Sequence, residues 1–263
     1  MSAITLATLQ AHRRDNTRFS CLTAYDATLA SLAADAGISV LLVGDSLGMV
    51  LQGHDSTLPV TLDDVVYHTR CVARAGVSSL IMADLPFMTN ATTGETLNAA
   101  GQLMRAGAQL VKLEGEGWLA DDIRELVRRG VPVCAHLGLR PQSVNALGGY
   151  RVQGREAAAS QRLIDDALTL EAAGAALILL ECVPAELGQR VRSAVSVPVI
   201  GIGAGPEVDG QILVMHDMLG ATRHRPPRFV RDFLAEGGSL SGAFRAYHDA
   251  VVTGSFPGPE HSF

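Results

Sequence analysis

The stretch VLLVGDSLG, residues 40–48, indicates how the chain is organised. It begins as a short apolar run rich in β-branched residues, which is typical of a buried strand. The run stops at Gly44, a carboxylate and a hydroxyl follow at once, and residues 49–61 show neither a helical nor a strand period. Long ordered loops attached to buried strands are usually functional. We therefore expect Asp45 and Ser46 to lie at the mouth of a barrel.

The same pattern recurs along the chain. In each copy a helix ends at a glycine, an apolar strand follows, and the strand ends in an acid or a histidine. The glycine is expected at the helix C-terminus, where the backbone takes a positive φ. Strands that are apolar on both faces are typical of parallel strands covered by helices. The glycines are Gly37, Gly76, Gly107, Gly130 and Gly174, and the residues ending the strands are Asp45, Asp84, Glu114, His136 and Glu181.

Three further strands are expected, at residues 20–24, 197–202 and 212–215. Helices are expected to begin at a capping box of Thr61 with Asp64 and at Thr92, and to cover residues 118–129 and 160–173. Strict alternation of strands and helices over 263 residues favours an α/β fold of the (β/α)8 TIM barrel type over an open doubly wound sheet. We expect one domain, residues 1–263, with a helical and Gly/Pro-rich C-terminal tail.

Composition narrows the functional classes. The net charge of −6 offers no basic excess for nucleic-acid binding. No apolar run reaches the roughly 18 residues of a membrane span, and the N-terminal segment lacks the apolar core of a secretion signal. The four cysteines are scattered without a C-x-x-C pair, which indicates reduced thiols. We therefore expect a cytoplasmic protein that contacts neither nucleic acid nor a membrane.

The acids at the strand ends point to a shared site. All strands of such a barrel end at one face, so Asp45, Asp84, Glu114 and Glu181 should meet there. Gathered carboxylates repel one another unless a cation or proton neutralises them, and ligands that are all oxygen suit Mg²⁺. Any one strand-terminal Asp could instead cap the following helix. Four acids together, with Lys112 beside Glu114, favour the metal site.

Other candidates are ambiguous on their own. His136 could be a structural residue or a pocket residue. The run GIGAG, residues 201–205, follows a strand where barrels often bind phosphate, but its spacing does not match a dinucleotide-binding motif. Its glycines could equally permit a tight turn beside the substrate. His216 and Asp217 are interpreted as structural residues.

An ordered set of motifs resembles the ketopantoate hydroxymethyltransferase (3-methyl-2-oxobutanoate hydroxymethyltransferase) family of pantothenate biosynthesis. The resemblance runs from about residue 4 to the C-terminus, and the ordered set is much more specific than any single motif. The motifs are TAYD (23–26), VGDSLG (43–48), QGHDSTLPV (52–60), ADLPF (83–87), VKLE (111–114), AHLG (135–138), PQS (141–143), LECVP (180–184), GIGAG (201–205) and DGQILVMHD (209–217).

The resemblance implies a TIM barrel that transfers a hydroxymethyl group from 5,10-methylenetetrahydrofolate to 3-methyl-2-oxobutanoate, giving 2-dehydropantoate through an enolate stabilised by Mg²⁺. It implies Glu181 as the proton acceptor, one Mg²⁺ per subunit and a homodecamer. Residues implied to hold the metal are Asp45, Asp84 and Glu114. Residues implied to surround the 2-oxo acid are Asp45, Ser46, Asp84, Lys112 and His136.

Two alternatives stay open. One is another Mg²⁺-dependent enolate enzyme on the same barrel, such as a phosphoenolpyruvate mutase or an isocitrate-lyase-like lyase, but the K-K-C-G-H motif common in such lyases is absent. The other is a non-catalytic barrel that senses an oxo acid or folate, against which stands the complete set of ligands and base. The segment Thr222–Pro227 departs from the Gly-containing run common in the family, so the resemblance does not define that loop.

Overall fold

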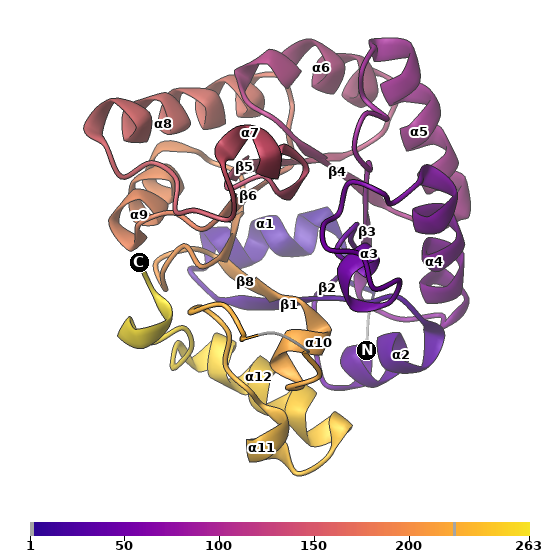
Figure 1. The fold of residues 1–263 in the computed structure, drawn as a ribbon, viewed down its shortest axis with the longest axis vertical. Helices are drawn as coiled ribbons and strands as arrows, with labels where there is room; N and C mark the ends of the chain where they lie inside the picture. The colour runs from indigo at the N-terminus through magenta and orange to yellow at the C-terminus, as the bar shows by residue number, and fades with distance from the viewer. Residues whose placement is uncertain (1–2, 223–224) are drawn as a thin grey trace.

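The predicted strands close into a ring in the computed structural model, which describes residues 3–222 and 225–263 (Figure 1). Each strand pairs in parallel with the next, and the last pairs with the first. The strands in the described residues are β1 (Phe19–Thr23), β2 (Val40–Val43), β3 (Leu80–Asp84), β4 (Leu110–Glu114), β5 (Val133–Gly138), β6 (Leu177–Glu181), β7 (Val199–Ile202) and β8 (Gly210–Leu213). The predicted (β/α)8 TIM barrel is thus confirmed.

Helices surround the ring of strands, so that both faces of nearly every strand are buried. They are α1 (Leu6–Arg14), α2 (Ala27–Asp35), α3 (Leu47–Val50), α4 (Leu62–Arg74), α5 (Thr93–Ala106), α6 (Ala120–Arg128), α7 (Val144–Leu147), α8 (Ala157–Ala172), α9 (Ala185–Ala194), α10 (Met215–Met218), α11 (Leu234–Gly237) and α12 (Leu240–Thr253). Short 3₁₀ segments are η1 (Gly117–Leu119), η2 (Pro141–Ser143) and η3 (Pro259–His261).

The helix ends follow the predicted signals. Thr61 and Asp64 form the expected capping box at the start of α4, and the Thr92 hydroxyl accepts a hydrogen bond from a backbone amide of α5. The five repeat glycines all take positive φ. Gly107 shows why a side chain is excluded there, because a Cβ would lie 2.4 Å from the Cβ of Ala73.

Several sequence-based boundaries differ from the structure by a few residues, as for β7, which begins at Val199, and α8, which begins at Ala157. Two differences have a clear physical reason. The loop after Asp45 begins with the short helix α3, because Leu47 is fully buried and its amide bonds back to the carbonyl of Gly44. The last strand was expected at residues 212–215 but begins at Gly210, where the chain passes against the Phe19 ring. It ends before Met215, whose amide donates to the Thr23 hydroxyl as α10 begins.

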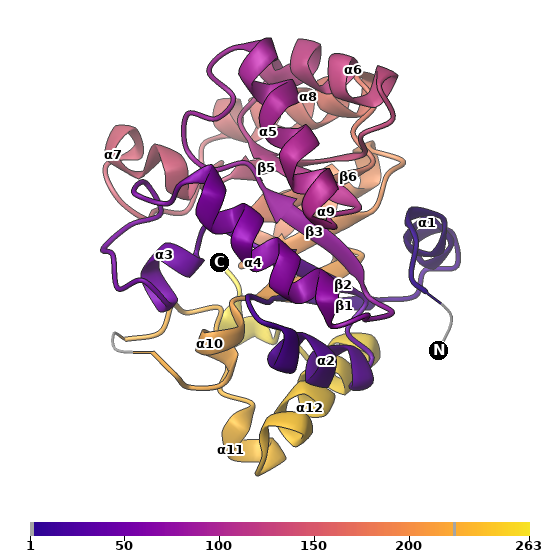
Figure 2. The same ribbon diagram turned by 90° about the vertical axis from the view of Figure 1, so that its right-hand side faces the viewer.

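The two ends of the barrel differ. In Figure 2, α3 and α7 lie at one end and α1 lies at the other. At the α1 end, Arg13 binds Asp209 at 2.7 Å and Arg192 binds the same carboxylate at 2.7 Å. In the C-terminal tail, α12 packs against β1 and α2, and the Tyr247 hydroxyl donates to backbone carbonyls of both β1 and β8.

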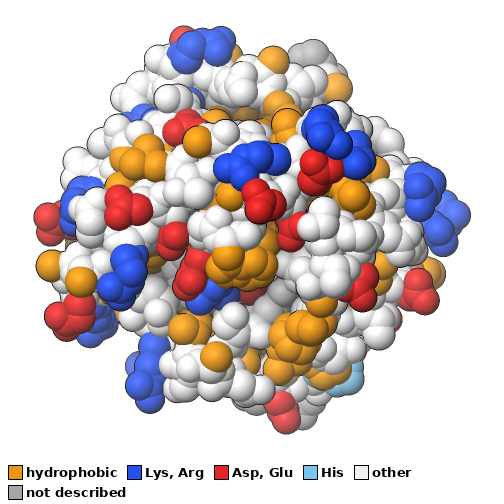
Figure 3. Space-filling view, turned by 90° about the horizontal axis from the view of Figure 1, so that it is seen from above, with side chains coloured by type: hydrophobic (Ala, Val, Ile, Leu, Met, Phe, Trp, Pro, Cys, Tyr) orange, Lys and Arg blue, Asp and Glu red, His pale blue; other side chains and the backbone are white. Residues whose placement is uncertain are grey.

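Within residues 3–222 and 225–263, no helix combines the length and apolarity that crossing a membrane would require. On the face seen in Figure 3, acidic and basic side chains are interspersed. That face therefore carries no basic stripe for a phosphate backbone.

Candidate active site

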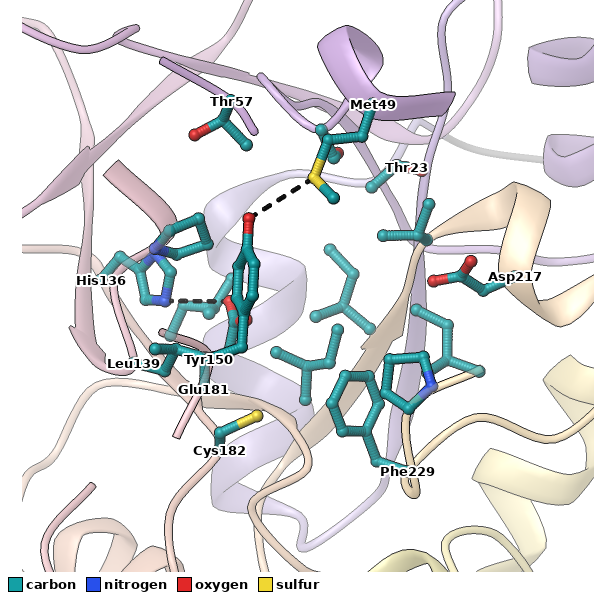
Figure 4. Close-up of a pocket in the computed structure, with 18 of the residues that line it drawn as sticks. Thr23, Met49, Thr57, His136, Leu139, Tyr150, Glu181, Cys182, Asp217 and Phe229 are labelled. Atoms are coloured by element: carbon teal, nitrogen blue, oxygen red, sulfur yellow. Dashed lines mark hydrogen bonds and ion pairs between the residues drawn. The ribbon is translucent and has the colours of Figure 1, made fainter. Parts of the chain in front are cut away.

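A cavity of about 500 Å³ opens where the carboxyl ends of the strands meet. Loops that follow β2, β5 and β8 complete its wall, and Figure 4 shows side chains entering it from several directions. The cavity is lined by every residue for which the sequence predicted a role, namely Asp45, Ser46, Asp84, Lys112, Glu114, His136 and Glu181. Long-range strand pairing thus assembles the predicted set at one place.

Lys112 provides a buried positive charge in this set. Its Nζ lies 2.5 Å from Oδ1 of Asp84 and 3.7 Å from Oε1 of Glu114. Burial alone would lower the pKa of Lys112, but these carboxylates and Asp45 raise it by more, so the net shift is upward. Lys112 therefore stays an ammonium group at neutral pH.

Gln142 links two of the predicted metal ligands. Its side-chain amide donates to Oδ2 of Asp45 at 2.8 Å and to the carbonyl of Leu85 at 2.9 Å. Its backbone amide donates to Oε2 of Glu114 at 3.0 Å. The residue lies in η2, within the PQS motif, to which the sequence analysis assigned no individual role. Gln142 thus fixes the orientation of two carboxylates.

His136 lies between two carboxylates at the ends of β4 and β6. Its Nδ1 is 3.3 Å from Oε1 of Glu114 and its Nε2 is 3.4 Å from Oε2 of Glu181, although neither contact has hydrogen-bond geometry. Burial and Lys112 lower the pKa of His136, but the two carboxylates raise it by more. This arrangement favours an imidazolium between the two carboxylates, and Figure 4 shows its contact with Glu181.

The carboxylates suit a divalent cation in kind and charge. Burial, and repulsion from neighbouring acids, raise the pKa values of Asp45 and Asp84. Oε1 of Glu114 is buried without a hydrogen-bond partner in the described residues. A hard cation bound there would offset the repulsion between the carboxylates and would give Oε1 of Glu114 a partner. As the described side chains are arranged, however, no three His, Cys, Asp or Glu residues converge as a ready metal cluster, because Lys112 and Gln142 engage the Asp84 and Asp45 oxygens.

Tyr25, which the sequence analysis did not single out, forms a hydrogen bond with the Ser46 side chain. The Oγ of Ser46 lies 2.9 Å from the hydroxyl of Tyr25, whose ring is almost fully buried. The imidazole of His68 in turn contacts the Tyr25 carbonyl at 2.7 Å. The Tyr25 contact restricts rotation of the serine hydroxyl at the cavity wall.

The opposite wall of the cavity is mostly apolar and includes Asp217, which was interpreted as structural. Burial raises the pKa of Asp217 to about 6. The turn at 201–205 borders this wall. Gly203 has a φ of 61°, and a Cβ there would lie 2.8 Å from the Phe229 ring. These glycines therefore make a tight turn beside the cavity, one of the two possibilities left open above.

The segment Thr222–Pro227 borders the same cavity in part. Arg225 and Pro227 line its rim, whereas Arg223 and His224 lie outside the described residues. Across the mouth, the Tyr150 hydroxyl donates to Sδ of Met49 at 3.7 Å (Figure 4). Loops from different strands therefore meet over the opening.

Comparison with known proteins assigns this site to a family. Residues 3–259 match the family model described as ketopantoate hydroxymethyltransferase. The chain belongs to this family. It is 66% identical to the 3-methyl-2-oxobutanoate hydroxymethyltransferase of Chromohalobacter salexigens and 58% identical to that of Klebsiella pneumoniae, in each case over 263 residues and 100% of both chains. The protein is thus an enzyme of the transferase class.

Solved structures that resemble the chain share its barrel. One is phosphonopyruvate hydrolase in complex with oxalate and Mg²⁺, with a TM-score of 0.64, 18% identity and coverage of 98% of this chain and 93% of the other. Another is 2,3-dimethylmalate lyase, a member of the PEP mutase/isocitrate lyase superfamily, with a TM-score of 0.59, 16% identity and coverage of 82% and 83%. At this identity the likeness concerns the fold alone.

Proposed function

We propose that the protein transfers a hydroxymethyl group from 5,10-methylenetetrahydrofolate to 3-methyl-2-oxobutanoate, giving 2-dehydropantoate for pantothenate biosynthesis. The observation that carries this proposal is the position of His136 between Glu114 and Glu181, beside the Lys112–Asp84 ion pair. In this proposal Glu181 would be the base, Lys112 the fixed positive charge, and the carboxylates the oxygen ligands, all lining one cavity. Removing a proton next to a carbonyl is favoured by a positioned base and by groups that stabilise the developing oxyanion.

The 2-oxo acid would lie against Ser46 and Lys112. The serine hydroxyl, oriented by Tyr25, can donate to the substrate carboxylate, and the Lys112 ammonium offsets its charge. Asp45, Asp84 and His136 complete the surroundings of the substrate. Both Lys112 and His136 are more than nine-tenths buried, so little water competes for these contacts.

Asp45, Asp84 and Glu114 would hold one Mg²⁺ per subunit. When bound, Mg²⁺ supplies Lewis acidity toward a carbonyl oxygen. Gln142 contributes by holding Asp45 and Glu114 in place through its side-chain and backbone amides. The chain's own residues thus prepare the carboxylates for the cation.

Glu181 would remove the proton from C3 of the oxo acid. Its carboxylate enters the cavity from the end of β6, and its Oε2 lies 3.4 Å from Nε2 of His136. The electron pair of the broken C–H bond moves toward the keto oxygen, giving an enolate. C3 would then bond to the one-carbon unit as its bond to one folate nitrogen breaks. The hydroxyl of a water would replace the other nitrogen. The proton taken by Glu181 and the remaining proton of the water would pass to the two nitrogens, so that tetrahydrofolate leaves.

The test is product formation by Glu181→Gln in the presence of Mg²⁺ and both substrates. We expect a loss of kcat of at least about a hundredfold, typical of removing a general base, with the Kd for 3-methyl-2-oxobutanoate little changed. Glu186→Gln, an exposed glutamate on α9, is the matched control and should retain full turnover. Turnover by Glu181→Gln at the wild-type rate would contradict the assignment.

The remaining expectations belong to the same proposal. The four cysteines are free thiols, which supports a reducing, cytoplasmic location. Packing of α12 on β1 and α2 supports one domain for residues 1–263, including the tail. Assembly into a homodecamer rests on the family resemblance, and the substrates are a 2-oxo acid and a folate.

A further inference from the structure

The cavity has two chemically distinct sides. All the residues assigned to the oxo acid, the metal and the base come from β2 to β6, whereas the far wall is formed after β7 and β8. That wall is largely apolar and includes Ile202, Val214 and Phe229, of which Ile202 and Phe229 are buried. A volume of about 500 Å³ is that of a site for a drug-sized ligand. A small branched oxo acid fills only the charged side.

Asp217 is the polar group of the far wall that has no function in the proposed mechanism. It follows β8 on α10 and enters the cavity opposite Glu181 and His136 (Figure 4). Within the described residues its carboxylate makes no hydrogen bond and no ion pair. A partly buried acid among apolar side chains is costly unless a donor reaches it. An arriving ligand with N–H groups would supply that donor.

We propose that Asp217 and this apolar wall bind the pteridine ring of the reduced folate donor. The carboxylate would accept hydrogen bonds from the 2-amino group and the adjacent ring N–H, and the flat ring would lie against Ile202, Val214 and Phe229. The inference rests on the proposed function, because it assumes that the donor is a folate. It identifies the folate subsite, which no short sequence motif marked.

The rim of the same wall matches the rest of a folate. Arg225 and Arg228 line the cavity and are exposed to solvent. The Arg228 guanidinium donates to the carbonyl of Glu260 at 3.0 Å and lies 5.7 Å from the centre of the Phe263 ring. The wall therefore combines an acid and apolar side chains with basic groups at its solvent-exposed rim. A folate presents N–H donors, an aromatic linker and an acidic glutamate.

The experiment measures tetrahydrofolate binding to the Mg²⁺-loaded protein by calorimetry, with 3-methyl-2-oxobutanoate binding measured in parallel. We expect Asp217→Asn to weaken tetrahydrofolate binding by about ten- to a hundredfold, the usual effect of losing hydrogen bonds to a charged group, and to leave oxo-acid binding unchanged. Asp55→Asn changes an exposed aspartate outside the cavity lining and should bind both as the wild type does.

A second ligand tests the contact without relying on one variant. The wild type should bind 2-desamino-2-methyltetrahydrofolate more weakly than tetrahydrofolate, whereas Asp217→Asn should discriminate between them much less. Wild-type affinity for tetrahydrofolate in Asp217→Asn, or an equal loss of oxo-acid affinity, would overturn this subsite and leave the proposed function standing. If the wild type binds the oxo acid but no tetrahydrofolate, both the subsite and the folate donor are wrong.

Discussion

Asp217 carries a carboxylate for which residues 3–222 and 225–263 provide no hydrogen-bond or ion-pair partner. Burial raises its pKa to about 6, above the value of about 3.9 for an aspartate in an unfolded chain. The folded protein therefore binds this proton more tightly than the unfolded chain does. At low pH the side chain is protonated in both states and does not lower the free energy of unfolding. As the pH rises through about 6, the folded protein must bury a charged carboxylate, and this part of the free energy of unfolding is lost.

We accordingly expect Asp217→Asn to stabilise the ligand-free protein above pH 6. The gain in the free energy of unfolding should be of the order of 2 kcal/mol at pH 7.5, and it should shrink as the pH falls from 6 toward 4. Urea unfolding of wild type and variant at pH 5.0 and 7.5 measures it. Equal unfolding midpoints at pH 7.5 would show that the carboxylate is not destabilised by burial. A gain together with lost folate binding would be a trade of stability for function.

At this scale the sequence revealed the acids and the lysine, but not the residues that hold them. Asp45, Asp84 and Glu114 were recognisable because each ends an apolar strand. The role of Gln142 depends on a side-chain contact with Asp45 across 97 positions of the chain. The contact between Tyr25 and Ser46 likewise requires two different strands to be neighbours. The hydrophobic periodicity within one segment cannot predict contacts between side chains that are distant in the sequence.

At the level of secondary-structure elements, helix α1 binds to the end of the barrel opposite the cavity. Arg13 reaches from α1 to Asp209, which immediately precedes β8. The same carboxylate binds Arg192 of α9 and accepts a hydrogen bond from the backbone amide of Val199 in β7. One buried aspartate thus joins helices α1 and α9, which lie far apart in the sequence, to the adjacent strands β7 and β8. The sequence analysis predicted neither α1 nor this cluster.

Asp209→Asn should therefore destabilise the protein strongly. The substitution leaves two partly buried guanidinium groups without their counter-ion, which typically costs about 3–5 kcal/mol. The midpoint of urea unfolding should fall accordingly. Asp121→Asn removes an exposed partner of Arg124 on α6 and should change the free energy of unfolding by less than about 1 kcal/mol. Equal midpoints for Asp209→Asn and the wild type would contradict the proposed role of the cluster.

For the whole molecule, the closed ring follows from a repeat visible in the sequence. Glycines at helix ends and strands apolar on both faces restrict the chain to a parallel sheet covered by helices. The least accurate parts were short elements, such as α3 and the ends of β8, where a few residues show no clear period. That Asp217 borders the cavity could not be predicted from the sequence, for a related reason. Asp217 lies on α10, and the side of α10 that borders the cavity depends on the pairing of β8 with β1 that closes the ring.

The measurement that tests the central claim most directly is deuterium exchange at C3 of 3-methyl-2-oxobutanoate. The protein is incubated in D₂O with Mg²⁺, tetrahydrofolate and the oxo acid, and the C3 proton is followed by NMR beside a chelated control. The account predicts loss of the signal in the wild type, and little loss with chelator or in Glu181→Gln. No exchange above the chelated control, in protein shown to be folded, would contradict proton removal by this site.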